Sequence, residues 1–225
     1  MTLTPRTERT RAALIDRAER MIAERGTGVS LREISAAAGQ RNHSAAQYHF
    51  GSREGLIEAV VATRSAEIDR RRGALLADLD GAVGAAGTVG ATVGATVEEL
   101  VAALVDPWVE LLGAEEPSYS LRFLAQVLDD PDLERALADS DDPPAGLRTI
   151  NRGLARRLQH LGSGDLTRRL TWTHAVALRV LAHEERLGTR PGPGLAAVRD
   201  DLVGMLAALL RAPAPATGRV PETPA

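Results

Sequence analysis

The sequence predicts an all-α protein, and three observations support this fold class. Apolar residues recur every three or four positions through most of the 225 residues, which is the pattern of helices that pack one face on a core. No convincing run alternates β-branched and polar residues as a strand would. Clusters of Gly, Pro and acidic residues separate the apolar segments and mark helix ends.

The first two expected helices lie near the N-terminus. Residues 7–25 carry apolar residues at helical spacing, and Gly26 follows as a left-handed stop. The second helix extends from Ser30 to Gly39 and begins with a capping box. In this motif Ser30 accepts a hydrogen bond from the amide of Glu33, and the Glu33 side chain bonds back to Ser30.

A short helix and a long helix follow. The short one is expected from about residue 42 to residue 50, ahead of Gly51. Ser52 then caps a long helix whose apolar residues continue to Leu76. The next segment, residues 81–97, contains only Gly, Ala, Val and Thr.

Three interpretations of this low-complexity segment compete. A membrane span would be longer and richer in Leu, Ile or Phe. A nucleotide-binding turn would need a strand before the glycines and an acidic residue after them. A flexible connection that is partly helical fits the composition best.

Further helices are expected in the remainder of the chain. Their approximate ranges are 96–112, 118–128, 131–138, 144–161, 165–187 and 194–211. The Pro-rich segment 212–225 lacks the apolar residues of a core and is expected to be disordered.

The short helix is unusually polar. Together with the preceding helix and the turn at Gly39 it forms a helix-turn-helix arrangement, whose second helix can enter the major groove of DNA. The outward side chains are able to bond base edges or phosphates, and they are Arg41, Asn42, His43, Ser44 and Gln47. A merely solvated helix is normally rich in Glu, Lys or Arg instead. DNA contact is therefore favoured over a solvated helical hairpin, which is the alternative.

Residues 10–61 resemble the N-terminal DNA-binding domain of the TetR family of transcriptional regulators. The shared features are Glu24-Arg25-Gly26, the capped helix from Ser30 to Gly39, Tyr48-His49-Phe50 and Ser52-Arg53-Glu54. The stretch from Gly39 to Phe50 is one residue longer than the commonest family spacing. An enlarged turn through Gln40 and Arg41 is therefore expected.

The resemblance implies two sets of DNA contacts. The base contacts are His43, Ser44 and Gln47, and the side-chain chemistry adds Asn42 to them. The phosphate contacts are Ser30, Tyr48, His49 and Arg53, and Arg41 joins them as a cation. Ser30 lies at a helix N-terminus, where amides and the helix dipole favour an anion.

The resemblance also divides the chain into three parts. Residues 1–61 form the helix-turn-helix DNA-binding domain, including the start of the fourth helix; residues 62–211 form a helical-bundle domain for ligand binding and dimerisation; residues 212–225 form the tail. The last two helices carry an apolar surface broader than one stripe, which a second copy would cover. The candidate interface residues are Val176, Val180, Leu202, Met205, Leu206 and Leu209.

A ligand pocket is expected among the aromatic residues of the second domain and their polar neighbours. The candidates are Trp108, Tyr119, Arg122, Phe123, Gln126, Trp172 and His174. Packing in the core is the alternative role for each aromatic residue.

Charge and composition narrow the function classes. Residues 1–50 contain eight Arg and five acidic residues, a net charge of +3, whereas the whole chain has −3. A basic N-terminal quarter on an acidic body suits contact with phosphates. The sequence has no Cys, and its N-terminus lacks the apolar core of a secretion signal, so a cytoplasmic protein is expected.

No enzyme is expected. The five His have no metal-ligand spacing, and no nucleophile elbow, phosphate loop or pair of catalytic carboxylates is present. The sequence therefore predicts a regulator that needs no metal, cofactor or membrane. The expected form is a homodimeric repressor that binds a palindromic double-stranded DNA operator and is released by a small-molecule effector. The alternative is a helical protein-interaction module that uses its helix-turn-helix to contact another protein.

Overall fold

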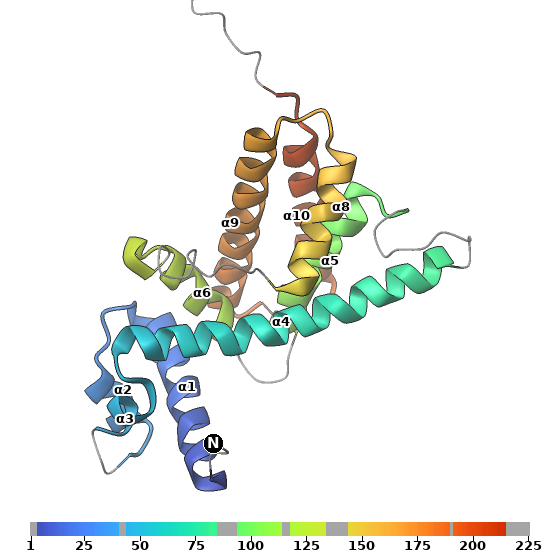
Figure 1. The fold of residues 1–225 in the computed structure, drawn as a ribbon. Helices are drawn as coiled ribbons and strands as arrows, with labels where there is room; N and C mark the ends of the chain where they lie inside the picture. The colour runs from blue at the N-terminus through green and yellow to red at the C-terminus, as the bar shows by residue number, and fades with distance from the viewer. Residues whose placement is uncertain are drawn as a thin grey trace, which may run out of the picture.

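The computed structural model describes residues 4–40, 44–84, 94–113, 118–133, 144–189 and 191–214, with the backbone alone over 80–84. Within these ranges the chain is helical and contains no strand (Figure 1). The helices are α1 (Pro5–Arg25), α2 (Leu31–Ala37), α3 (Ala45–Phe50), α4 (Arg53–Gly84), α5 (Val97–Leu112), α6 (Ser120–Leu128), α8 (Ala145–Arg157), α9 (Ser163–Leu187) and α10 (Pro193–Arg211). The predicted all-α fold is confirmed.

Local sequence signals fix the ends of α1 and α2. Thr4 caps α1 and Pro5 occupies its first turn, where the missing amide of proline costs nothing. Gly26 ends α1 with φ at +85°, a conformation that residues with a side chain rarely adopt. The predicted capping box of Ser30 and Glu33 at the start of α2 is present.

The next two helices differ from expectation at their ends. The helix α3 is described from Ala45, and residues 41–43, where an earlier start was expected, lie outside the described residues. The helix α4 continues to Gly84, so the first part of the low-complexity segment is helical. Residues 85–93 of that segment lie outside the described residues.

The later helices follow the predicted order. A second capping box, made by Thr96 and Glu99, starts α5, and Pro107 lies inside this helix without ending it. Of the helix expected over 131–138, the described residues 131–133 are helical. The tail beyond residue 214 lies outside the described residues.

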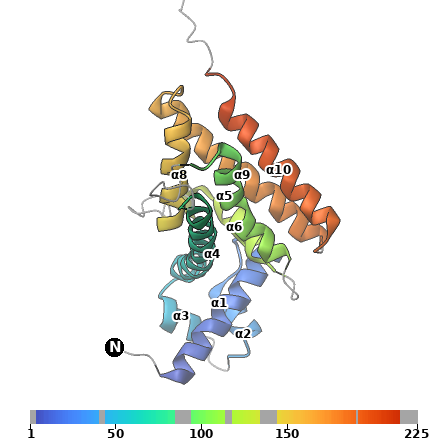
Figure 2. The ribbon, with the colours of Figure 1, turned by 90° about the vertical axis from the view of Figure 1, so that its right-hand side faces the viewer.

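The long helix α4 connects the two parts of the molecule. It runs from the group formed by α1, α2 and α3 to the group formed by α5, α8, α9 and α10 (Figure 1). The last two helices, α9 and α10, lie side by side in both views (Figures 1 and 2). This arrangement separates the helix-turn-helix from the apolar helices at the C-terminal end.

Each part has its own apolar core, and α6 contributes to both. Phe123 and Val127 pack into the core of α1 to α3 and the start of α4. Leu121 and Ala125, from the opposite side of α6, pack into the core of the second part. A shift of α6 would therefore disturb both cores, because packed interiors leave little room for independent movement.

A buried polar cluster also links the two parts of the molecule. The Arg64 guanidinium from α4 donates to the Glu19 carboxylate of α1, with Nε to Oε1 at 2.7 Å. The Ser120 hydroxyl from α6 donates to the same Oε1 at 2.6 Å. Because Glu19 and Ser120 are buried, these bonds are shielded from water and tie three helices together.

No helix in the described ranges is both long enough and apolar enough to cross a lipid bilayer.

Candidate nucleic-acid interface

The α2–turn–α3 unit is held in one geometry by contacts within it. The hydroxyl oxygen of Ser35 accepts a hydrogen bond from the amide of Ala46 at 3.3 Å, which links α2 to α3 directly. Ile34 and Ala46 are fully buried beneath the two helices. In the turn, Gly39 has φ at +68°, in the left-handed region that favours glycine.

This packing turns one side of α3 outward. Tyr48 is 83% exposed, and Ser44 and Gln47 are also exposed. His49 is partly buried, and its ring meets the edge of the Tyr48 ring at 5.2 Å between centroids. Four predicted DNA contacts therefore lie on α3 or at its start, and the most outward large side chain is Tyr48.

The predicted base contacts are only partly described. Arg41, Asn42 and His43 lie outside the described residues. The side-chain amide of Gln47 donates to the backbone carbonyl of Gly51, so it caps its own helix. Reading adenine through two hydrogen bonds would require Gln47 to leave that carbonyl.

Two residues predicted to contact phosphates, Ser30 and Arg53, form hydrogen bonds to other groups of the same chain. The amide and hydroxyl of Ser30 both donate to the Glu33 carboxylate, at 3.0 and 2.7 Å. The Arg53 guanidinium donates to the Thr27 carbonyl at 2.6 Å and to Glu54 at 3.1 Å. Arg53 therefore holds the connection between α1 and α2, and both phosphate contacts stay predictions.

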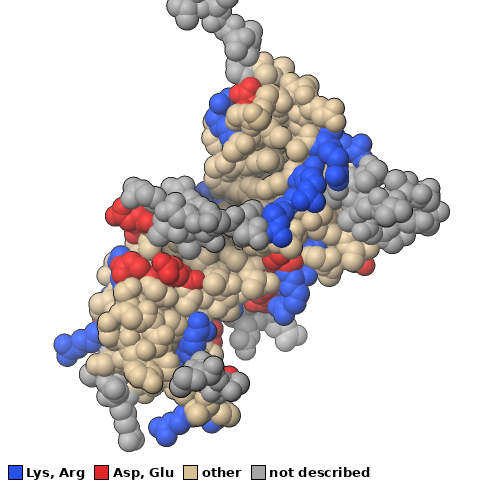
Figure 3. Space-filling view, in the orientation of Figure 1, with Lys and Arg blue, Asp and Glu red and all other residues tan. Residues whose placement is uncertain are grey.

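Arginines form ion pairs with the carboxylates near the α2–turn–α3 unit and neutralise their negative charge. Glu33 accepts from Arg25 at 2.6 Å, and Glu24 pairs with Arg20 at 3.0 Å. The hydrogen bond from the Ser30 amide, followed by that from Arg25, lowers the pKa of Glu33 to about 2. In the space-filling view, Arg side chains project from several sides of the end that contains α1 to α3 (Figure 3).

Within the described part of the chain, the candidate ligand residues have different surroundings. Phe123 is fully buried in the N-terminal core, which corrects its assignment to a pocket. Tyr119 lies between the guanidiniums of Arg20 and Arg122, each 5.0 Å from its ring centroid. Trp172 is 51% exposed on α9. Aromatic residues alone could not reveal these different surroundings, because they depend on how distant helices pack.

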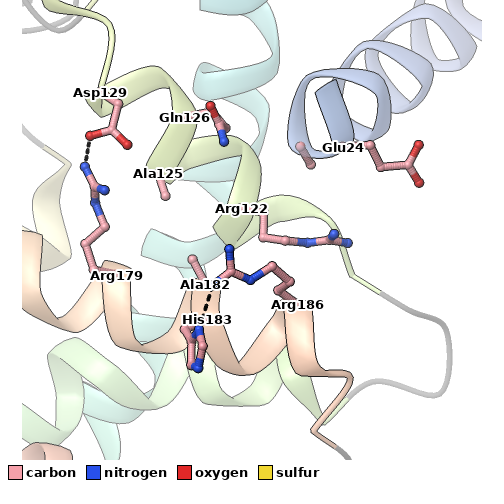
Figure 4. A pocket seen from close by; sticks show the side chains of 10 residues that line it. Glu24, Arg122, Ala125, Gln126, Asp129, Arg179, Ala182, His183 and Arg186 are labelled. Carbon is pink, nitrogen blue, oxygen red and sulfur yellow. Dashed lines mark hydrogen bonds and ion pairs between the residues drawn. The ribbon is translucent and has the colours of Figure 1, made fainter. Parts of the chain in front are cut away.

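Arg122 and Gln126 do line a pocket of about 410 Å³ between α1, α6 and α9 (Figure 4). Its wall is rich in arginines that already have partners. Arg179 pairs with Asp129, and Arg122 donates to Glu185 at 3.3 Å. The pocket is therefore a charged depression beside the DNA-binding part, with its cations largely neutralised.

Trp108 lies in the core of the second part, and His174 is a partly buried residue of α9. Trp108 Nε1 and His174 Nε2 are buried without a hydrogen-bond partner among the described residues, as are Arg72 Nε and Asn151 Oδ1. Arg72 and Asn151 were not predicted as site residues. Arg72 belongs to the run Arg70-Arg71-Arg72, which resembles a solvated charged segment. Helical spacing could have predicted that Arg72 is buried. The apolar Ile68 and Leu76 lie four residues before and after it, on the same face of the helix.

The candidate dimer residues also divide into two sets. Leu202 and Leu206 are buried in the core of the chain itself, so they offer no surface to a partner, which corrects their assignment. Met205 and Val176 are 55% and 38% exposed. Val180 and Leu209 are partly buried, and the exposed Trp172 lies on the same helix as Val176.

Comparison with known proteins adds a sequence match. Residues 14–60 match the family model described as bacterial regulatory proteins, tetR family. This range contains α2, α3 and the start of α4. No curated protein matches the chain.

Two solved structures resemble the chain. One is a crystal structure of a proposed TetR-family transcriptional regulator from Rhodococcus sp., with a TM-score of 0.58 and 16% sequence identity, covering 90% of this chain and 99% of that one. The other is a TetR-family transcriptional regulator from Pectobacterium atrosepticum, with a TM-score of 0.44 and 22% identity, covering 93% of this chain and 96% of that one. The first likeness supports the fold over nearly the whole chain.

Proposed function

We propose that the chain is a TetR-family regulator, a homodimeric repressor of transcription, on the basis of the match of residues 14–60 to the tetR family model. It binds a palindromic operator in the cytoplasm through α3, and a small-molecule effector releases it from the DNA. Residues 1–61 form the DNA-binding domain, and residues 62–211 form the domain for dimerisation and effector binding.

The observation that carries DNA binding is the contrast between the two sides of α3. Ala46 is fully buried, whereas Tyr48, two residues later, is 83% exposed. Tyr is seldom left so exposed on a helix that only packs, because its ring gains free energy by burial. An outward phenol on a fixed helix can donate to a DNA phosphate while its neighbours approach base edges.

Dimerisation is supported by the outer surface of α9 and α10. Trp172, Val176 and Met205 are large apolar residues that remain exposed there. Two such helix pairs would cover each other as a four-helix interface related by a two-fold axis. Such a dimer carries two copies of α3, and its symmetry calls for a palindromic operator with half-sites about one helical turn apart.

Release by an effector is supported by the position of α6 between the two cores. An effector that stabilises a different packing of the second part would shift α6 and, through the Glu19 cluster, move α1 relative to α4. The separation of the two α3 helices would then no longer fit successive major grooves. The effector acts by favouring one of two existing arrangements.

DNA selected by the purified protein from a random pool tests this proposal. We expect a palindromic consensus, bound with an affinity that falls steeply with salt because neutralised phosphates release counterions. Gln47→Ala should bind the consensus and a scrambled duplex with more similar affinities than the wild type does. Absence of duplex binding even at low salt would instead favour the protein-interaction module.

A further inference from the structure

The second part of the molecule contains an arginine in an unusual place. Ile68, Arg72 and Leu76 are spaced four residues apart along α4, and all three are at most 5% exposed. An arginine in such an apolar row gives up its hydration, which costs several kcal/mol unless an opposite charge and hydrogen bonds compensate. Burial accordingly lowers the pKa of Arg72 to about 10.

Among the described residues the only charge that favours ionised Arg72 is that of Asp69, and it acts at a distance because no hydrogen bond or ion pair joins the two side chains. The Arg72 Nε has no hydrogen-bond partner among these residues, and no ion pair joins its guanidinium to a carboxylate. The nearby Asp69 is already used by another helix, because its two oxygens accept from the amides of Gly146 and Leu147 at the start of α8, each at 3.1 Å. Arg72 is therefore a buried cation whose Nε has no hydrogen-bond acceptor among the described residues, while the oxygens of the nearest carboxylate bond to α8.

Trp108 supplies a second hydrogen-bond donor beside this cation. The Arg72 Cζ atom lies 5.4 Å from the centroid of the Trp108 ring. Trp108 is 6% exposed, and its indole Nε1–H has no partner among the described residues. A buried indole N–H usually has an acceptor, since leaving it unpaired costs about 1 to 3 kcal/mol. Two donors, one of them charged, therefore lie together in an apolar core.

His174 supplies an acceptor from α9. Its Nδ1 lies 2.7 Å from the Leu170 carbonyl oxygen, so Nδ1 carries the proton and Nε2 is left with a lone pair. That Nε2 is buried and has no partner among the described residues. Burial, and then the charge of Arg72, lowers the pKa of His174, which keeps the ring neutral.

We propose that Arg72 and Trp108 bind the carboxylate of a small organic acid inside the helical bundle, and that His174 accepts a hydrogen bond from a second polar group of the same molecule. A carboxylate matches these donors because a guanidinium can donate two parallel hydrogen bonds to its two oxygens. The apolar body of the acid packs against core side chains one helical turn from Trp108 and His174, which are Leu104 and Leu178. This inference rests on the proposed function, since it names the chemical class of the effector.

Fluorescence of Trp108 in the full-length protein tests the site. The chain has two Trp, so Trp172→Phe leaves Trp108 as the only indole. The probes are a series of straight-chain carboxylates together with benzoate and salicylate, and the matched neutral amides serve as controls. We expect at least one carboxylate, and not its amide, to change Trp108 fluorescence and raise the melting temperature.

Two variants in the Trp172→Phe background assign the effect to Arg72. Arg72→Met removes the buried charge with an apolar side chain of similar length, so it should fold and should lose the carboxylate response. Arg72→Lys keeps the charge but loses the two-pronged donor geometry, so carboxylate affinity should fall at least tenfold. His174→Phe should weaken salicylate, which carries a hydroxyl, more than benzoate.

The proposal is overturned if no carboxylate in the series binds, if amides bind equally well, or if Arg72→Met retains the response. Operator binding is measured separately on the chain that keeps Trp172, with and without the same acids, because Trp172 belongs to the proposed dimer surface. If an acid binds through Arg72 but does not release DNA, the proposed carboxylate site stands. Release from DNA by that acid is then contradicted. A chain that binds no DNA contradicts the proposed repressor and leaves the carboxylate result unchanged.

Discussion

At the scale of single residues, neighbouring positions on α3 have different surroundings and therefore different expected roles. Ala46 has no exposed surface, and its backbone amide donates to the Ser35 hydroxyl, so it fixes the helix. Gln47 is exposed but bonded to Gly51, and Tyr48 projects into solvent. A substitution at Tyr48 can therefore change DNA binding without changing the fold.

We expect Tyr48→Phe to weaken operator binding about tenfold, because a hydrogen bond to a charged phosphate is worth about 1.5 kcal/mol. The free energy of unfolding should stay within about 0.5 kcal/mol of the wild type, as is usual for exposed positions. Operator titrations and urea unfolding measure the two quantities. Unchanged operator affinity would remove the Tyr48 hydroxyl from the interface.

The Glu33 carboxylate predicts a pH dependence of stability. Its pKa is about 2 in the folded protein and near 4.5 without these contacts, so the folded state favours the ionised form. The resulting stability is present above pH 4.5 and is lost as the pH falls from 4.5 towards 2. Glu33→Gln should unfold more easily than the wild type at pH 7, and the difference should shrink on acidification.

Urea unfolding of both proteins between pH 7 and pH 3 measures this difference. Ser30→Ala is the matched control, because it removes the hydroxyl of the capping box and keeps the backbone amide that contributes most to the lowered pKa. It should retain most of the pH dependence. A difference between wild type and Glu33→Gln that does not vary with pH would contradict the assignment.

At the scale of helices, the closest packing described for a helical glycine outside the N-terminal part lies between α4 and α8. A Cβ atom on Gly146 would lie 2.7 Å from Asp69 Oδ1 and 3.0 Å from Arg72 Cβ. Gly146 also donates its amide to Asp69, so the absence of a side chain lets the start of α8 approach this carboxylate. The adjacent α4 residue Gly73 has no heavy atom within 4 Å of the same constructed position.

Two alanine substitutions should therefore have opposite effects. Gly146→Ala should destabilise the protein by about 1 to 3 kcal/mol, because α8 must move away from α4. Gly73→Ala should stabilise it by about 0.5 to 1 kcal/mol, since Ala loses less backbone entropy in a helix. Urea unfolding compares the two variants. Equal effects of the same sign would show that α8 does not pack this closely on Asp69.

At the scale of the whole molecule, the α9–α10 surface is the expected site of self-association. Met205→Glu would place a charge on that surface, and the two-fold symmetry of a dimer would bring a second charge into the same interface. Uncompensated burial of charge costs several kcal/mol, so the dimer dissociation constant should rise roughly hundredfold or more. Operator affinity should fall with it, because a monomer carries only one α3.

Sedimentation velocity over a range of concentrations measures this change. Leu128→Glu is the matched control, because Leu128 is also exposed but lies at the end of α6. It should leave the association state as in the wild type. Wild-type protein that is monomeric at all concentrations, or a Met205→Glu variant that dimerises normally, would contradict the proposed interface.

The sequence by itself determined the local structure of this protein. Ser30 with Glu33 and Thr96 with Glu99 form capping boxes, and the glycine stop at Gly26 is readable from residue type, because these signals act within one helical turn. Local spacing also predicts a polar helix at α3, which lies within the residues 14–60 that match the family model.

Only the tertiary structure decided which side chains each helix buries against a distant partner. It moved Leu206 from the expected interface into the core, placed Phe123 beneath α1 to α3, and enclosed Arg72 beside Trp108. Helical periodicity gives the buried side of a helix but does not say whether the same chain or a second molecule covers it. That choice depends on contacts between residues far apart in sequence, which the packing of α4, α6, α9 and α10 settles.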